Sequence, residues 1–333
     1  MDIITRLFTL RRLLLVGFFL LIAIFVTTFP MYASLYYVRA LCTIIMYIVL
    51  AVSWAMFSGP TGYMSLAPAA FLGVGIYVSA VLHGQTETLL PLPAVILIGA
   101  LASFILAFIV GLVTLRLKGI YFAVFTFGLV VLLHELILWV ELNINEISGR
   151  YPRTVSIDTI LYISFGILVA TLIAAYFIRR SRLGLAMQSI GGNEEAAEHM
   201  GVNTTMVKVV TFAISAAFMG AIGAITAPRI VYVHADVAFN VSYSFLPVVM
   251  AVLGGMGQFY GPIIGAFVLS FTEVRLRPQY PYYYMLAFGI ILILIIFFLP
   301  GGFAGLIQRL LDRLRGQTSK LRKGNGVEQH ADT

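Results

Sequence analysis

Few residues of this sequence are of types and spacings that could do chemistry. His134 and Glu135 begin the H-E-x-x-H pattern of a zinc protease, but Leu138 stands where the second histidine is needed. The sequence has neither the G-x-x-x-x-G-K-[ST] motif that cradles nucleotide phosphates nor the G-x-S-x-G elbow of a serine hydrolase. Cys42 is the single cysteine, which excludes a cysteine-cluster metal site. We therefore expect no catalytic residue, no metal site and no cofactor in this chain.

An acidic segment at residues 193–201 is the strongest candidate for a protein contact. Its sequence, NEEAAEHMG, places three of the chain's 14 acidic residues among good helix formers and ends on a glycine. It lies within the connection 179–206, in an otherwise loop-poor sequence. The pattern predicts a short helix outside the bilayer that docks a partner. A bare loop is the alternative.

Four ionisable residues lie in or at the ends of apolar runs: His134, Glu135, Lys208 and Glu273. A carboxylate in hydrocarbon is costly and by default indicates a functional site or a buried pair. Glu135 and Glu273 fall near the predicted outer interface, where we expect water to solvate them.

Membrane helices are the elements that must position these residues. Of the 333 residues, 61% are hydrophobic and only 11% are charged, whereas soluble domains have about 45–50% and about 25%. We expect an all-α integral membrane protein, a polytopic bundle of about eight to ten transmembrane helices. The candidate crossings are the apolar runs 13–29, 40–57, 66–83, 93–115, 119–140, 159–178, 206–228, 243–256, 259–274 and 282–299.

The basic residues indicate the orientation of these crossings. With both termini inside, the inner segments hold 15 of the 21 Lys and Arg residues, in agreement with the positive-inside bias. We expect a membrane domain at residues 1–307 and a basic cytoplasmic tail at 308–333. Such a tail fits the surface of anionic membrane lipid rather than nucleic acid.

Small residues and prolines predict where helices pack closely or break. Lipid supplies no hydrophobic drive between helices, so stripes of small residues are expected at their contacts. Such stripes are Gly254, Gly257, Gly261 and Gly265; Ser65, Ala69 and Gly73; and Ala216, Gly220 and Ala224. Pro68, Pro247 and Pro262 predict short or broken helices at 63–82 and 247–265. Interrupted segments of this kind indicate a transport path.

Five stretches, in order, resemble the motifs of LivM-type permeases, a family of membrane subunits of branched-chain amino acid ABC importers. SGPTGYMSLAPAAFLGVGIY at 58–77 is similar to S-G-x-x-G-Q-x-S-L-G-x-x-A-F-x-G-I-G-A-Y, and LRLKGIYFA at 115–123 to L-R-x-x-G-I-Y-F-A. NEEAAEHMGV at 193–202 resembles N-E-x-A-A-E-x-x-G-I. LGGMGQFYGPIIGA at 253–266 resembles L-G-G-x-G-x-x-x-G-P-x-x-G-A, and LPGG at 299–302 the closing L-P-x-G.

The resemblance implies the permease subunit of an ATP-binding cassette importer for leucine, isoleucine or valine. It would be a multi-pass protein of the cell inner membrane with both termini cytoplasmic, a transport subunit and not an enzyme. The implied partners are a homologous second permease, two cytoplasmic subunits that bind and hydrolyse ATP, and an extracytoplasmic solute-binding protein.

The resemblance also assigns roles to residues. The acidic segment would be the coupling loop: its charged residues would dock on an ATPase subunit, Ala197 would allow close packing and Gly201 would end the helix. The coupling residues are then Asn193, Glu194, Glu195, Ala197, Glu198 and Gly201. The translocation path and its helix packing are expected at Ser65, Phe71, Gly73, Tyr77, Tyr121, Gly254, Gly257, Gly261, Pro262 and Gly265.

Several positions depart from the family pattern. Tyr63 stands where the family usually has glutamine, and Pro68 where it often has histidine. In the connection 179–206, uncharged residues occupy three positions that are commonly arginine: Leu185, Gln188 and Gly191. Two alternatives therefore stay open: a permease of the same family for urea, short amides or another amino acid, and a stand-alone secondary transporter.

Overall fold

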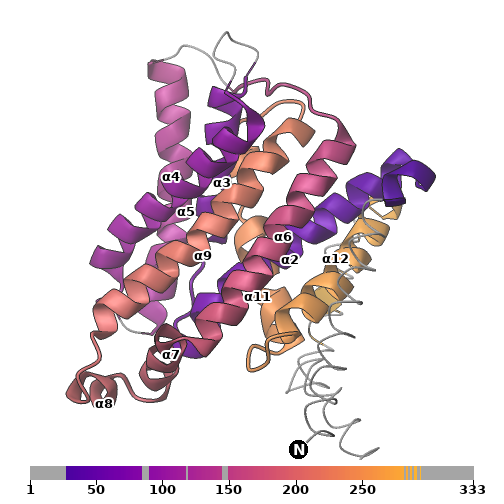
Figure 1. Cartoon of the computed structure of the whole chain (residues 1–333). Helices are drawn as coiled ribbons and strands as arrows, with labels where there is room; N and C mark the ends of the chain where they lie inside the picture. The colour runs from indigo at the N-terminus through magenta and orange to yellow at the C-terminus, as the bar shows by residue number, and fades with distance from the viewer. Residues whose placement is uncertain are drawn as a thin grey trace, which may run out of the picture.

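The part of the chain described by the computed structural model is a bundle of tilted helices (Figure 1). The described residues are 28–84, 90–117, 119–144 and 149–280, with single residues 283, 286, 289, 290 and 293. The main helices are α2 (Leu35–Thr61), α3 (Pro68–Leu82), α4 (Leu92–Thr114), α5 (Ile120–Asn143), α6 (Ile157–Arg180), α7 (Arg182–Gly192), α8 (Glu194–His199), α9 (Thr204–Thr226), α11 (Ser242–Gly254) and α12 (Gly261–Gln279). Two shorter elements, η1 (Ala227–Arg229) and α10 (Ala235–Ala238), lie between α9 and α11. The predicted all-α architecture is confirmed.

Six helical segments of the described residues are long and apolar enough to cross a membrane. They are Leu35–Thr61, Leu92–Thr114, Ile120–Asn143, Ile157–Arg180, Thr204–Arg229 and Ala235–Gly254. Helix α3 is apolar but has only 15 residues. The first predicted crossing, 13–29, and the last, 282–299, lie almost entirely outside the described residues. The chain is therefore a multi-pass membrane protein.

The predicted helix interruptions are both present. Residues 62–67 are not helical, and α3 begins at Pro68. A second break, residues 255–260, separates α11 from α12, whose first turn contains Pro262. Pro247 lies inside α11 without ending it.

The non-helical segment 62–67 finds its backbone partners within the protein. The Thr126 hydroxyl accepts a hydrogen bond from the Leu66 N–H at 2.9 Å. The Trp54 indole donates to the Ser65 carbonyl at 2.7 Å, and the Ser244 hydroxyl donates to the Leu66 carbonyl at 2.8 Å. Irregular backbone inside a helical bundle requires such internal partners, because its N–H and C=O groups lack helical hydrogen bonds. The side chains of α2, α5 and α11 thus hold this break in place.

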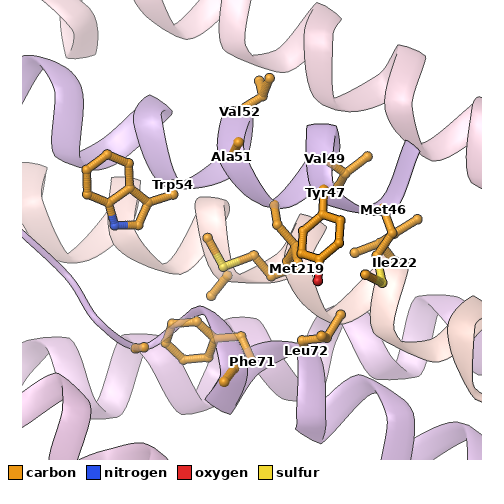
Figure 2. Packing of buried hydrophobic residues seen from close by; sticks show 14 of the residues in the cluster. Met46, Tyr47, Val49, Ala51, Val52, Trp54, Phe71, Leu72, Met219 and Ile222 are labelled. Carbon is orange, nitrogen blue, oxygen red and sulfur yellow. The ribbon is translucent and has the colours of Figure 1, made fainter. Parts of the chain in front are cut away.

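Helices α2 and α9 form the centre of the bundle. In their most apolar windows 78% of the residues are buried, against 28% in α4 and α5. Helix α9 packs chiefly on α4 and α3, and α2 packs on α6, α12 and α9. Figure 2 shows the layer between them, where Trp54 of α2, Phe71 of α3 and Met219 of α9 lie together. The outer faces of α4 and α5 carry exposed large apolar side chains, as expected of surfaces that contact lipid or another subunit.

Glycines allow the closest helix contacts. A Cβ atom on Gly220 of α9 would overlap the side chain of Ser103 and the carbonyl oxygen of Gly99, both on α4. On α11, a Cβ on Gly254 would overlap the carbonyl oxygen of Gly261. The stripe 254–265 is not one face of a single helix, however, because Gly257 lies in the break and has no atom near its Cβ position.

Candidate functional site

The acidic segment forms helix α8, which follows α7 at one end of the bundle (Figure 1). We name this end the α7–α8 end. The Asn193 side chain caps the helix by accepting a hydrogen bond from the Ala196 N–H at 3.1 Å. Gly201 follows with a φ of 85°, a left-handed conformation that favours glycine. The predicted short helix is confirmed, and the bare loop is wrong.

A buried ionic cluster, the Tyr63–Glu194–Lys208 network, joins α8 to the bundle. The Lys208 ammonium lies 2.6 Å from Glu194 Oε1 and donates to the Tyr63 hydroxyl at 3.2 Å. The Tyr63 hydroxyl donates to Glu194 Oε2 at 2.5 Å. Burial and the adjacent Glu194 carboxylate raise the pKa of the Tyr63 phenol, so it keeps the proton that it donates. A third Lys208 hydrogen bond, 3.0 Å long, goes to the carbonyl of Leu115 at the end of α4.

The network is almost closed to solvent and draws on four parts of the fold. The Lys208 side chain is 3% exposed and that of Glu194 15%. Its groups come from α8, from the non-helical segment 62–67, from α9 and from the end of α4. Removing one member of a buried pair leaves an uncompensated charge, which is strongly destabilising. The arrangement therefore fixes α8 to the segment that precedes the short helix α3.

The charged residues of α8 were all expected to dock on a partner, but two of them contact the rest of this chain. Glu194 is held by Lys208, and Ala197 is fully buried against the bundle. The Glu198 carboxylate accepts a hydrogen bond from the Thr204 hydroxyl at 2.6 Å. Glu195, Ala196, Glu198, His199 and Met200 are exposed, Met200 by 71%. Glu195, Glu198 and His199 thus lie on the outward side of α8, and Met200 follows it. Glu194 is held by the bundle, and its part in coupling stays a prediction.

The residues expected along a translocation path are spread over different parts of the described bundle. Ser65 and Phe71 are buried in the core. Tyr77 of α3 is stacked on Phe239, with ring centroids 5.7 Å apart. Tyr121 is 72% exposed at the start of α5, away from the others. Their part in translocation stays a prediction.

The remaining path residues are glycines and one proline. Some of them lie in close helix contacts and others line a cavity. A Cβ on Gly73 would overlap the ring of Phe239, so this glycine serves close packing. Gly254, Gly261 and Gly265 bring α11 and α12 together. Gly257 and Pro262 line a cavity at the α7–α8 end, and Ser65 and Phe71 line a small void in the core.

Two cavities lie at opposite ends of the described bundle. The cavity at the α7–α8 end has about 430 Å³ and lies between α2, α6, α7 and the break 255–260. Arg179 lines it and donates to the Gly257 carbonyl at 2.5 Å. The opposite cavity has about 670 Å³ and contains Arg229 of η1, which donates to the Thr43 hydroxyl at 2.6 Å.

Sequence analysis missed Tyr63 and Arg229 as candidates. Tyr63 appeared only as a departure from a motif, and Arg229 was not singled out. The sequence feature that could have indicated them is a charged residue at each end of the apolar run 206–228, namely Lys208 at its start and Arg229 after its end. What these residues contact depends on helices that are distant in sequence.

Comparisons with known proteins place the chain among transport permeases. Residues 36–296 match the family described as "Branched-chain amino acid transport system / permease component". The high-affinity branched-chain amino acid transport system permease protein LivM of Salmonella typhimurium is 27% identical over 81% of this chain and 70% of its own length. The corresponding protein LivH of Escherichia coli is 30% identical over 41% of this chain and 44% of its own. The ribose import permease protein RbsC of Haemophilus influenzae is 28% identical over 36% and 39%. No solved structure matches the chain.

Proposed function

This chain belongs to the family of branched-chain amino acid transport system permease components, and we propose that it is the membrane-spanning subunit of an ATP-binding cassette importer for branched-chain amino acids. The observation that carries the proposal is α8, a short helix outside the bundle whose inner face is bound to the core by the Tyr63–Glu194–Lys208 network. Such a helix suits a subunit that receives movement from a separate ATPase.

The proposed assembly contains a homologous second permease, two cytoplasmic ATP-binding subunits and an extracytoplasmic solute-binding protein. ATP is bound and hydrolysed by the ATP-binding subunits, and this chain supplies the path. The family match and the partial likeness to LivH support a pair of related permeases.

Coupling is proposed to run through α8. Its exposed residues Glu195, His199 and Met200 contact an ATPase subunit, while Glu194 and Ala197 hold it to the bundle. A displacement of α8 on ATP binding then moves the segment 62–67 and α9 with it, because one buried network joins all three. Conformational switches commonly proceed by rigid-body movements of packed helices or domains. The result is a change between outward- and inward-facing states.

Charge reversal on the outward face of α8 tests this coupling. In the assembled complex, Glu195→Lys is expected to lower solute-stimulated ATP hydrolysis about three- to tenfold, since a reversed charge at an interface weakens docking. The stability of the complex should not change with this substitution, because the Glu195 side chain is exposed. The matched control is Asp158→Lys. Asp158 is an exposed acidic residue in the first turn of α6, at the end of the bundle opposite the α7–α8 end. Equal stimulation in both variants would remove the docking role of this face.

We further propose that the α7–α8 end faces the cytoplasm and that both termini lie on that side, in the inner membrane. The basic residues near this end support this orientation. They are Arg116, Arg179, Arg180, Arg182 and Lys208.

Labelling in a background that lacks the native thiol tests the orientation. Cys42 is buried, so Cys42→Ala removes it with little change to the surface. In right-side-out vesicles, a membrane-impermeant maleimide should label Thr154→Cys without lysis. The same reagent should label Glu195→Cys only after lysis. The opposite pattern would reverse the proposed orientation.

The assembly itself is tested by purification and reconstitution. The tagged chain, extracted in mild detergent, should bring down near-stoichiometric P-loop ATPases and a second permease. Proteoliposomes with the purified complex and its binding protein should take up leucine when ATP is supplied to the ATPase side. Ribose and urea are the competing solutes, and ribose is included because of the partial match to RbsC. A chain that purifies alone, in a detergent that preserves ABC complexes, would favour a secondary transporter.

A further inference from the structure

The cavity opposite the α7–α8 end, here named the outer cavity, has the size of a small-molecule site. It lies between the first half of α2, the chain that enters α6, and η1. Its volume of about 670 Å³ falls within the usual range of about 300–1,000 Å³ for ligand pockets. Two of the helices that border it, α2 and α6, also border the cavity at the α7–α8 end.

Arg229 gives the outer cavity a distinctive charge. Its Nη2 atom donates to the Thr43 hydroxyl at 2.6 Å and to the Arg39 carbonyl at 3.2 Å. Within the described residues, Arg229 has no carboxylate in salt-bridge distance. The described lining of the cavity includes Arg39 and Arg229 and no acidic residue. The cavity is therefore positive, with a guanidinium already oriented by the protein.

A guanidinium in this setting suits a carboxylate ligand. Arg229 is partly buried, so its guanidinium keeps only part of its contact with water and gains from a counter-charge. Arginine presents its N–H groups as a planar fork that matches a carboxylate with two parallel hydrogen bonds. Nη2 of Arg229 alone bonds to the chain, and its other nitrogens have no hydrogen-bond partner in the described part of the protein.

The rest of the wall suits an aliphatic group. Met46, Ile160 and Val237 line the cavity together with two tyrosines, Tyr47 and Tyr243, whose ring centroids lie 6.5 Å apart. The Tyr47 hydroxyl donates to the buried Glu273 at 3.4 Å, which orients this ring. Binding pockets of small molecules commonly combine such an apolar wall with one or two polar anchors.

We propose that the outer cavity binds the transported α-amino acid, with the Arg229 guanidinium holding its carboxylate and the apolar wall contacting its side chain. Thr43 is a positioning residue that orients Arg229. This inference rests on the proposed function, because it requires an amino acid as the solute.

Binding to the wild-type complex, in nanodiscs without the solute-binding protein, is the first test. Bound tritiated leucine is displaced with unlabelled leucine or with leucinol, which lacks the carboxylate. A charge-assisted hydrogen bond contributes about 1.5–3 kcal/mol, so leucinol should compete about ten- to hundredfold more weakly. Equal competition, or the absence of saturable leucine binding, would overturn the proposal. This test needs no variant and so does not depend on how substitutions fold.

Variants of Arg229 locate the binding. Arg229→Gln should raise the dissociation constant of leucine about ten- to hundredfold, and Arg229→Lys, which keeps the charge but not the fork, by less. The matched control is Arg153→Gln, an exposed arginine at the same end that does not line the cavity. Leucine affinity should not change in this control. Wild-type affinity in Arg229→Gln would overturn the proposal.

ATP-driven uptake separates this inference from the proposed function. If the wild-type complex takes up leucine and Arg229→Gln does so with an unchanged KM, the site is wrong and the importer stands. If the wild-type complex takes up no branched-chain amino acid, the proposed function fails, and the site with it.

Discussion

Replacing Lys208 with methionine is expected to lower the free energy of unfolding by about 3–5 kcal/mol and to abolish leucine uptake. The substitution leaves the buried Glu194 carboxylate without its ammonium partner, and the Leu115 carbonyl loses a hydrogen bond. The loss would also weaken the attachment of α8 to the bundle, which would then depend on the Tyr63–Glu194 and Thr204–Glu198 hydrogen bonds and on the buried Ala197. Thermal unfolding of the purified complex and uptake by proteoliposomes measure the two effects.

Removing both charges together separates stability from coupling. Lys208→Met combined with Glu194→Gln leaves no buried charge, so much of the stability should return. Uptake should recover less than stability, since the ionic link between α8 and α9 is still missing. Glu195→Gln, on the exposed face of the same helix, is the matched control and should unfold like the wild type. A single variant Lys208→Met with wild-type stability would contradict the role of the network.

The second large effect is expected at the contact between α9 and its neighbours. Gly220→Ala should destabilise the chain by about 1–3 kcal/mol. The new methyl group would overlap the backbone of α4 at Gly99 and the side chain of Ser103. Since α9 lies at the centre of the bundle, a shift of this helix would also disturb its contacts with α3 and α2. The temperature of unfolding and the yield of assembled complex report the change.

A glycine in a similar helical position but without neighbours provides the control. Gly128 of α5 has no atom within 4 Å of its Cβ position. Alanine is a better helix former than glycine by about 1 kcal/mol, so Gly128→Ala should be neutral or slightly stabilising. Equal unfolding temperatures for the two alanine variants would mean that the α9 contact tolerates the extra volume.

Local signals of the sequence were sufficient for the class of protein and for most helices. Apolar runs long enough to span a bilayer predicted α2, α4, α5, α6 and α9 within a few residues. Pro68 and Pro262 indicated interruptions within 63–82 and 247–265, and each lies in the first turn of the helix that follows a break. The helix formers of residues 193–201 and the glycine that ends them predicted α8, because both signals act within one short segment.

The faces of these helices were decided only by the tertiary structure. Windows of α5 and α9 are both apolar enough to span a membrane, yet 28% of the residues are buried in the first and 78% in the second. Lipid and protein interior are equally apolar, so hydropathy cannot distinguish a residue that faces lipid from one in the core. Tyr121, expected along a path, is exposed on α5, and its part in translocation stays a prediction.

The ionic contacts depended on the same long-range packing. Glu194 was predicted as a coupling residue from its charge and the family resemblance, and the sequence does not show the direction of its side chain. Lys208 is 14 residues away and Tyr63 is 131 residues away, and only the folded bundle brings them to Glu194. Arg229 likewise became a candidate when α2 supplied Thr43 and the outer cavity. The sequence by itself determined a helical membrane permease and the positions at which its helices are interrupted, since both follow from local composition. Which charged side chains contact one another was decided by the packing of helices that are distant in the sequence.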